Sequence, residues 1–277
     1  MKMRICLCTV SLIVCHLALA GMPQPMVVYY GQAKDGFGWP YRRDADVILL
    51  HGTNEIARHT IAGSLAPGVN FALDVPLDDG RDATAYARNA LRTGEIVSII
   101  VQDTYGQQTI MESNAVPAVA GPGDFILINV TAGTDTVGDG LPDAWKLELI
   151  AMSGGALTSL WCVVGSDDFD QDGQSNEEEY RAGTFAWLDY DFFYVEQLAP
   201  AADDRLRLTF LSVPGKVYRI FAAPLALEGS AFAWSDCEYA LTETGPLGTG
   251  PAEGDGDWLS FYVPLSPANR VLRLTVE

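Results

Sequence analysis

Residues Asp168–Glu179 read D-F-D-Q-D-G-Q-S-N-E-E-E. This stretch fits the pattern D-x-[DN]-x-[DN]-G-x5-E at every specified position, which is the pattern of a calcium-binding loop that runs into a helix. Ca²⁺ takes roughly six to eight oxygen ligands at about 2.3–2.6 Å, and side chains at alternate loop positions converge on the ion when the loop wraps around it. The stretch therefore predicts a calcium site followed by a short helix.

Six residues of this loop are expected to face the ion with an oxygen atom: Asp168, Asp170, Asp172, Gln174, Asn176 and Glu179. The three aspartates supply carboxylates, Gln174 its backbone carbonyl, and Asn176 an oxygen that binds directly or through water. Glu179 lies one helical turn further on and closes the shell with both carboxylate oxygens. Because so many carboxylates repel one another without a cation, metal binding and local folding are expected to be coupled.

A second copy of the loop lies upstream, where Asp135–Lys146 reads D-T-V-G-D-G-L-P-D-A-W-K. Its candidate ligands are Asp135, Asp139, the Leu141 carbonyl and Asp143. Two positions depart from the pattern, because Val137 replaces the second carboxylate and Lys146 places a cation where the bidentate acid belongs. Two interpretations stay open. The loop holds a weaker ion with the help of waters or of Glu148, or it is a degenerate repeat that keeps only its turn and helix.

The order D-G-L-P-D-A-W, then D-x-D-x-D-G-x-S-N-x-E-E-Y, resembles the repeat pairs of thrombospondin type 3 repeats and dockerin modules in secreted bacterial proteins. Neither loop has an obvious entering helix, which separates the pair from paired EF-hands. The resemblance implies structural calcium and, for dockerins only, a cohesin partner.

Short apolar runs bounded by Gly, Pro, Asp and Asn predict β-strands on both sides of the loops. They are PMVVYYGQ, ADVILLHG, NFALDV, EIVSIIVQD and DFILINVT before the loops, and LRLTFLSV, KVYRIFAA, WLSFYVPL and RVLRLTVE after them. Ala83–Leu91 has a helical composition and predicts a short helix. The segment YGQAKDGFGWPYRRDADVIL resembles the opening of carboxypeptidase-regulatory or transthyretin-like sandwiches, which informs the fold only.

We therefore expect a mainly β protein, with two β-sandwich-like domains joined by a small α-helical, EF-hand-like calcium-loop unit. The expected parts are a signal peptide at residues 1–20, an N-terminal β-sandwich domain at 22–131, the double calcium-loop unit at 132–190 and a C-terminal β domain at 191–277. The helical part of the unit is expected in LPDAWKLELIAM and SNEEEYRAG, because both have the apolar spacing and turn residues of short helices.

The first twenty residues, MKMRICLCTVSLIVCHLALA, combine a basic start, an apolar run and a small-x-small cleavage signal. No later stretch approaches the roughly 18 consecutive apolar residues of a membrane span. These features predict export without membrane insertion after cleavage, to the periplasm, the cell surface or the medium. Cys162 and Cys237 then remain. An oxidising compartment favours a disulfide between them, but a core cysteine also behaves as a small hydrophobe, so both states stay open.

The charge excludes one class of partner. With 17 Lys+Arg against 36 Asp+Glu the net charge is −19. Because nucleic acids bind basic surfaces, a nucleic-acid partner is not expected. After the signal peptide the chain keeps only His51 and His59, and no hydrolase, zinc or phosphate-binding motif occurs. We therefore expect no catalytic residue.

The sequence predicts an exported, non-enzymatic calcium-binding protein in which the ion stiffens the junction between two β domains. A dockerin-like partner binder is one alternative. The other is a carbohydrate-binding or adhesion module, because such modules stack sugars on exposed aromatic rings. Two groups of aromatic residues bear on it: Tyr29, Tyr30, Phe37, Trp39 and Tyr41, and Trp187, Tyr190, Phe192, Phe193 and Tyr194. Packing in a core or between domains is the simpler role for these rings.

Overall fold

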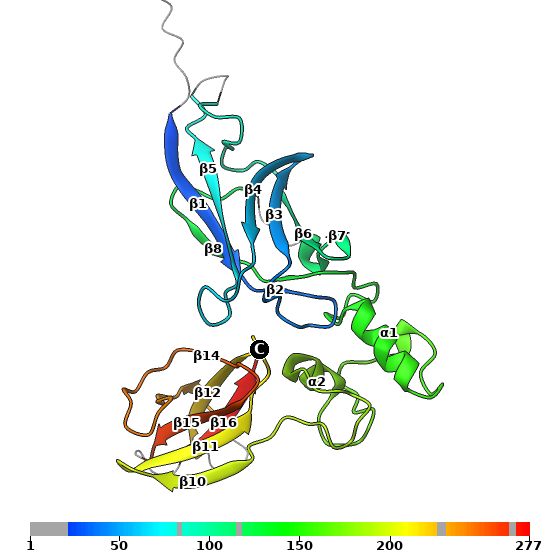
Figure 1. Cartoon of the computed structure of the whole chain (residues 1–277), viewed down its shortest axis with the longest axis vertical. Helices are drawn as coiled ribbons and strands as arrows, with labels where there is room; N and C mark the ends of the chain where they lie inside the picture. Colours follow the sequence, from blue (N-terminus) through cyan, green and yellow to red (C-terminus); the bar gives the residue numbers. More distant parts are fainter. Residues whose placement is uncertain (1–21, 82–84, 115–117, 226–230, 266–269) are drawn as a thin grey trace, which may run out of the picture.

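The computed structural model describes residues 22–81, 85–114, 118–225, 231–265 and 270–277. Over these residues the chain has several sheets and two short α-helices, which confirms the prediction of a mainly β protein (Figure 1). The predicted signal peptide lies outside the described residues. Within them, no helix is both long and apolar enough to cross a membrane.

The first sheet is built around β1 (Pro23–Gly31), which pairs antiparallel with β5 (Phe71–Asp78) and parallel with β8 (Phe125–Leu127). The chain continues into β2 (Ala33–Lys34), which pairs in parallel with β9 (Val130–Thr131). Alternate residues of the second half of β1 are buried, as expected for a strand with one face toward a core.

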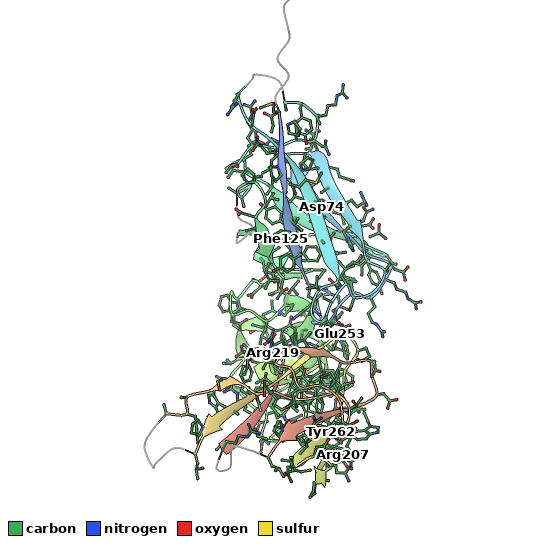
Figure 2. The ribbon with its side chains drawn as sticks, turned by 90° about the vertical axis from the view of Figure 1, so that its left-hand side faces the viewer. Asp74, Phe125, Arg207, Arg219, Glu253 and Tyr262 are labelled. Carbon is green, nitrogen blue, oxygen red and sulfur yellow. The ribbon has the colours of Figure 1, made fainter. Side chains whose placement is uncertain are left out.

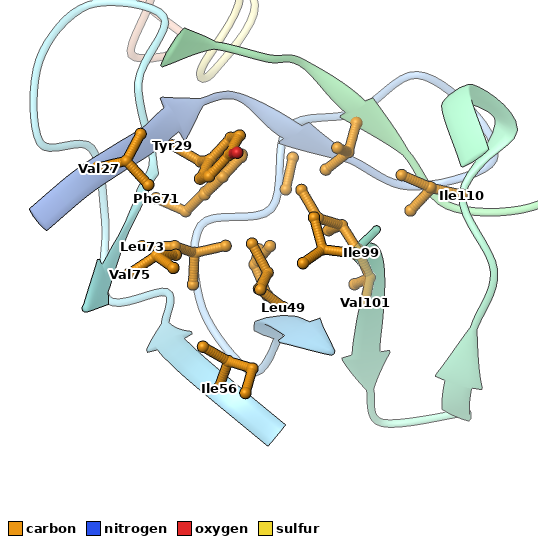
Figure 3. Packing of buried hydrophobic residues seen from close by; sticks show 14 of the residues in the cluster. Val27, Tyr29, Leu49, Ile56, Phe71, Leu73, Val75, Ile99, Val101 and Ile110 are labelled. Carbon is orange, nitrogen blue, oxygen red and sulfur yellow. The ribbon is translucent and has the colours of Figure 1, made fainter. Parts of the chain in front are cut away.

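The second sheet has the order β4-β3-β6-β7. Its strands are β3 (Asp46–His51), β4 (Asn54–Thr60), β6 (Ser98–Asp103) and β7 (Gly106–Gln108). Buried side chains of both sheets form one hydrophobic cluster, in which Tyr29 and Phe71 from the first sheet join Leu49, Ile99 and Val101 from the second (Figure 3). The predicted strands of this region are confirmed.

The short helix predicted at Ala83–Leu91 is wrong for the residues that the structure describes. Residues 85–91 form bends and a turn, while residues 82–84 lie outside the described part. Leu91 is buried against the sheet edge, where its N–H donates to the Pro76 carbonyl at 2.9 Å and its carbonyl accepts from Asp78 at 2.8 Å. A short helix is marginal by itself, so these long-range bonds and the burial of one leucine outweigh local helix propensity.

The middle of the chain carries the helices. A short 3-10 turn, η1 (Met111–Asn114), precedes α1 (Asp143–Met152), and a second, η2 (Leu160–Cys162), precedes α2 (Asn176–Ala182). The two predicted helices are confirmed. A small cluster of buried residues holds this region together: Leu141, Trp145, Leu149, Val163 and Ala186.

The last part of the chain forms two further sheets. The first has the order β10-β11-β15 and contains β10 (Gln197–Ala201), β11 (Arg205–Leu211) and β15 (Trp258–Pro264). Arg207 of β11 lies opposite Tyr262 of β15, and Figure 2 labels both. The sequence predicts β11 and β15 but not β10, whose segment QLAPA includes a proline and has no long apolar run.

The other sheet has β12 (Val217–Pro224) at its centre, paired antiparallel with β13 (Ser235–Asp236), β14 (Ala252–Glu253) and β16 (Arg270–Val276). Aromatic rings fill the space between the two sheets. Phe210 of β11 lies 4.9 Å from Tyr218 of β12 and 5.3 Å from Phe261 of β15, measured between ring centroids.

The two β-rich parts touch directly. The Gln32 side chain, which is buried, donates from Nε2 to the Gly215 carbonyl at 2.9 Å. Ser64 Oγ donates to Glu253, which lies where the two parts meet (Figure 2). Figure 1 shows α1 and α2 beside this junction, with the N-terminal sheets above it and the C-terminal sheets below.

The two cysteines in the described part of the chain are not bridged. Both Cys162 and Cys237 are free thiols, the first exposed on η2 and the second buried in the core of the C-terminal sheets. Of the two states that the sequence leaves open, the structure therefore has the unbridged one.

Candidate metal centre

Three aspartates of the downstream loop converge. One carboxylate oxygen from each of Asp168, Asp170 and Asp172 lies within 4.8 Å of the others, so the group can hold a metal ion. In an extended segment these three alternate side chains would share one face but stand roughly 6–7 Å apart along the chain, so the backbone must wind to bring their oxygens together. Gln171 at φ 68° and Gly173 at φ 101° supply that winding.

Backbone N–H groups bond to the aspartate oxygens and hold the loop in shape. Asp168 Oδ1 accepts from the Gln171 N–H at 2.7 Å, and Asp168 Oδ2 accepts from the Gly173 N–H at 3.0 Å. Asp172 Oδ1 accepts from the Gln174 N–H at 2.7 Å. In contrast, Oδ2 of Asp170 and Oδ2 of Asp172 are buried and have no hydrogen-bond partner among the described residues.

Helix α2 brings a fourth carboxylate, that of Glu179, close enough for its charge to interact with those of the three aspartates. Ser175 caps the helix through its side chain, which accepts from the Glu178 N–H, and the Glu178 carboxylate accepts in return from the Ser175 N–H at 2.9 Å. This capping box fixes the first turn, on which Glu179 points into the protein. Glu179 is fully buried, and neither of its carboxylate oxygens has a partner among the described residues.

Asn176 is also buried at the start of α2. Its Nδ2 donates to the Val164 carbonyl at 2.8 Å, whereas its Oδ1 has no partner among the described residues. Of the seven buried side-chain polar atoms without a partner in the described part of the chain, five belong to Asp170, Asp172, Asn176 and Glu179. Because buried polar atoms are almost always hydrogen-bonded, this concentration in one loop fits a place that can hold a cation.

The electrostatics agree with this conclusion. Burial, followed by the charges of Asp170, Asp172 and Asp168, raises the pKa of Glu179 to about 8. Burial also raises the pKa of Asp170, with further contributions from its neighbours Asp172 and Asp168. A carboxylate is driven toward its neutral form where the surroundings offer it no positive charge, so the protein alone does not balance this cluster.

The side chain of Gln174 has a role that the sequence does not predict. Its side chain turns away from the aspartates and clamps the backbone of Phe193, donating from Nε2 to the Phe193 carbonyl at 2.5 Å and accepting at Oε1 from the Phe193 N–H at 3.2 Å. The backbone carbonyl of Gln174 stays the predicted ligand oxygen of this residue. Since the Phe193 ring lies 5.6 Å from Phe210 in the C-terminal core, the side chain of Gln174 ties the loop to that core.

The upstream loop is organised differently. Asp135 accepts from the N–H groups of Gly138 and Gly140 at 2.7 and 2.8 Å. Asp143 accepts at 2.9 Å from the Thr136 N–H and at 2.7 Å from the Thr134 hydroxyl. Asp139 accepts from Lys146 Nζ at 2.6 Å. No carboxylate oxygen of this loop is among the buried atoms without a partner in the described part of the chain.

Three contacts that the sequence does not predict meet at Tyr180, directly after the downstream loop. Lys216, which is almost fully buried, donates from Nζ to the Tyr180 carbonyl at 3.2 Å. The Tyr180 ring lies 5.6 Å from the Trp145 ring, edge to face. A Cβ added to Gly38 would lie 2.5 Å from this ring, so the loop after β2 packs directly on it. Helix α2 therefore touches both β-rich parts.

The other residues considered for function are dispersed. His51 and His59 lie at opposite ends of the β3–β4 hairpin, where they pair with Asn54 and Val47. Of the aromatic residues, Tyr29 is buried and Phe193 packs in the C-terminal core, whereas Tyr190 is 73% exposed and Tyr194 is 50% exposed. Phe37, Trp39 and Phe192 also count among the exposed large apolar side chains.

The chain was compared with families, curated proteins and solved structures. No family model, no curated protein and no solved structure matches it.

Proposed function

We propose that the loop Asp168–Glu179 binds one Ca²⁺ ion, and that the ion stiffens the junction between the two β-rich parts of an exported, non-enzymatic protein. The observation that carries the proposal is the fully buried carboxylate of Glu179, whose two oxygens have no partner among the described residues and whose charge interacts with those of three aspartates. A cation at this place would neutralise all four groups at once.

The chemistry of the donors selects the ion. Carboxylate, amide and carbonyl oxygens are hard ligands that suit Ca²⁺, whereas zinc and copper sites in proteins use nitrogen or sulfur donors more often. The sequence spacing matches the calcium loop at each specified position, and a bidentate acid at its last position favours the larger coordination shell of Ca²⁺ over that of Mg²⁺.

The route from the ion to the junction is short. Glu179 precedes Tyr180, whose carbonyl holds Lys216 and whose ring packs against Gly38. Gln174, inside the loop, holds Phe193 of the C-terminal part. An ion that fixes the loop therefore fixes the attachment points of both β-rich parts, and it opposes local opening, which is the step that exposes a chain to proteolysis.

The test is a pair of melting experiments on the Asp172→Ala variant. Ca²⁺ at 100 times its dissociation constant stabilises the folded state by about 2.7 kcal/mol. Asp172→Ala is expected to lower the melting temperature, relative to the unaltered protein, in calcium but not in chelator. Asp167→Asn is the matched control, because Asp167 is exposed and directly precedes the loop. An equal loss in calcium and in chelator would refute the proposal.

A further inference from the structure

The two loops share one backbone design. In both, the carboxylate at position 1 accepts from the N–H groups at positions 4 and 6: Asp135 from Gly138 and Gly140, and Asp168 from Gln171 and Gly173. All four of those N–H donors belong to residues with positive φ, between 68° and 101°. The loops are therefore two copies of one structure.

The agreement continues to the helix start. In each loop the carboxylate at position 5 accepts from the N–H at position 7. Asp139 accepts from Leu141 in the upstream loop, and Asp172 accepts from Gln174 in the downstream loop. The N–H at position 9 donates to the carbonyl just before the loop, from Asp143 to Thr134 and from Asn176 to Asp167, both at 2.8 Å. Helices α1 and α2 both begin at this ninth position.

The copies differ at position 12. Lys146 and Glu179 are both fully buried, but one is a cation and the other an acid. Lys146 Nζ lies 2.6 Å from Asp139 Oδ2, whereas the equivalent atom of the downstream loop, Asp172 Oδ2, has no partner among the described residues. The ammonium group of Lys146 thus binds the Asp139 oxygen whose counterpart in the downstream loop is available to bind an ion.

We propose that Lys146 is the permanent cation of the upstream loop, which therefore holds its shape without metal and binds no Ca²⁺. The buried ammonium neutralises Asp139, and the Asp143 carboxylate is engaged by the Thr134 hydroxyl and the Thr136 N–H, whereas Asn176 Oδ1 at the same loop position has no partner among the described residues. A divalent ion would have to displace a buried lysine, whose charge would then lie unpaired in the protein interior.

This arrangement makes the response to calcium one-sided. Helix α1 follows the upstream loop and packs on the N-terminal part, where a Cβ added to Gly36 would lie 3.2 Å from the Ala144 side chain. Helix α2 follows the downstream loop and holds the C-terminal part through Tyr180 and Lys216. Removal of calcium is thus expected to loosen α2 and to leave α1 in place.

The repeat supplies its own matched pair of variants, Asp135→Asn and Asp168→Asn, at the same loop position. In calorimetric calcium titrations we expect one ion per chain for the unaltered protein, one ion with an unchanged dissociation constant for Asp135→Asn, and none for Asp168→Asn. Two ions in the unaltered protein, or a loss of binding in Asp135→Asn, would overturn the proposal. This contrast rests on the proposed downstream calcium site.

A variant designed to gain a calcium ion in the upstream loop tests the role of Lys146 independently of the downstream site. The double variant Val137→Asp/Lys146→Glu restores the carboxylates at positions 3 and 12 and is expected to bind one more ion than the unaltered protein. If the unaltered protein binds none, the downstream proposal fails, and one ion in the double variant still supports the role of Lys146. A folded double variant without an additional ion would contradict it.

Lys146→Met serves if the double variant does not fold. It keeps the length of the side chain but removes the ammonium, so that Asp139 Oδ2 loses its partner. Because the lost cation is part of the chain, we expect the melting temperature to fall by the same number of degrees in calcium and in chelator. No fall in either condition would overturn the proposal.

Discussion

Tyr180 and Lys216 form the contact through which α2 holds the C-terminal sheets. The Tyr180 carbonyl accepts from Lys216 Nζ at 3.2 Å, and the same ammonium lies 5.7 Å from the centroid of the Tyr180 ring. Tyr180 directly follows Glu179, and Lys216 directly precedes β12. One peptide bond therefore separates a candidate metal ligand from the contact that joins two parts of the chain.

Glu179→Gln is expected to change stability in opposite directions with and without calcium. In chelator the variant should be more stable than the unaltered protein by about 1 kcal/mol, because a buried carboxylate near three aspartates becomes neutral. In saturating calcium it should be less stable by roughly 2–3 kcal/mol, because the bidentate ligand is lost. Urea denaturation in the two conditions measures both differences.

Asp167→Asn is the control for this reversal of the stability difference between calcium and chelator. It removes one negative charge beside the loop from an exposed residue, so its effect should be small and similar in both conditions. If Glu179→Gln behaves as this control does, the carboxylate of Glu179 is no ligand.

Gly38→Ala tests the contact of the N-terminal part with α2. Gly38 has φ 84°, and an added Cβ would meet the Tyr180 ring, which Trp145 holds from another side. We expect a loss of roughly 2–4 kcal/mol in the free energy of unfolding, from the strained backbone and the overlap together.

Gly52→Ala separates the two causes. Gly52 has φ 60°, but no atom lies within 4 Å of the added Cβ, so only the cost of about 1–2 kcal/mol for the left-handed backbone is expected. Equal losses for Gly38→Ala and Gly52→Ala in urea denaturation would show that Tyr180 does not pack tightly on Gly38.

Lys216 predicts a dependence of stability on pH. Burial, together with the charge of Lys34, lowers the pKa of Lys216 to about 7, although Asp35 acts in the opposite direction. The unfolded chain keeps a lysine pKa near 10.4, so between about pH 7 and pH 10 it binds more protons than the folded chain. Stability from this group therefore rises with pH in that window, and the slope vanishes below it.

Lys216→Met removes this contribution. From pH 7 to pH 9 the unaltered protein is expected to gain unfolding free energy relative to the variant. The gain is on the order of 2 kcal/mol. Denaturation in saturating calcium at several pH values measures it. A difference that stays constant would mean that Lys216 titrates at its ordinary pKa.

Cys162 and Cys237 should differ in reactivity. The experiment uses the chain from Gly21 onward, which contains no other cysteine. Cys162 is exposed, and its hydrogen bond with the Ser159 hydroxyl, with further contacts from Thr158, lowers its pKa. Burial raises the pKa of Cys237. We expect one thiol to react with a thiol reagent in the native protein and two in denaturant, and Cys162→Ser to abolish the native reaction. No free thiol in denaturant without reductant would indicate a disulfide.

Local features of the loops could be predicted from the sequence. The spacing of Asp168, Asp170 and Asp172 determines which groups converge, because the backbone of such a loop winds in one way. Ser175, Glu178 and Gly183 are a complete set of signals for the start and end of α2. The strands with long apolar runs follow from the same kind of local pattern.

The contacts that join the parts could not be predicted in this way. Lys216 and Tyr180 are 36 residues apart, and no local pattern pairs a lysine with a distant backbone carbonyl. Strand β10 is extended because it pairs with β11, and Leu91 is held by backbone hydrogen bonds at the edge of β5. Tertiary contacts therefore determine the structure of both segments. Lys146 departs from the loop pattern already in the sequence, but its burial against Asp139 is visible only in three dimensions.

The most direct measurement is a calorimetric calcium titration of the chelator-stripped protein. We predict one ion per chain, a heat that Glu179→Gln removes, and a melting temperature that rises with occupancy of the site. Absence of heat, together with an unchanged melting temperature in millimolar calcium, would contradict the assignment of Asp168–Glu179 as a calcium site.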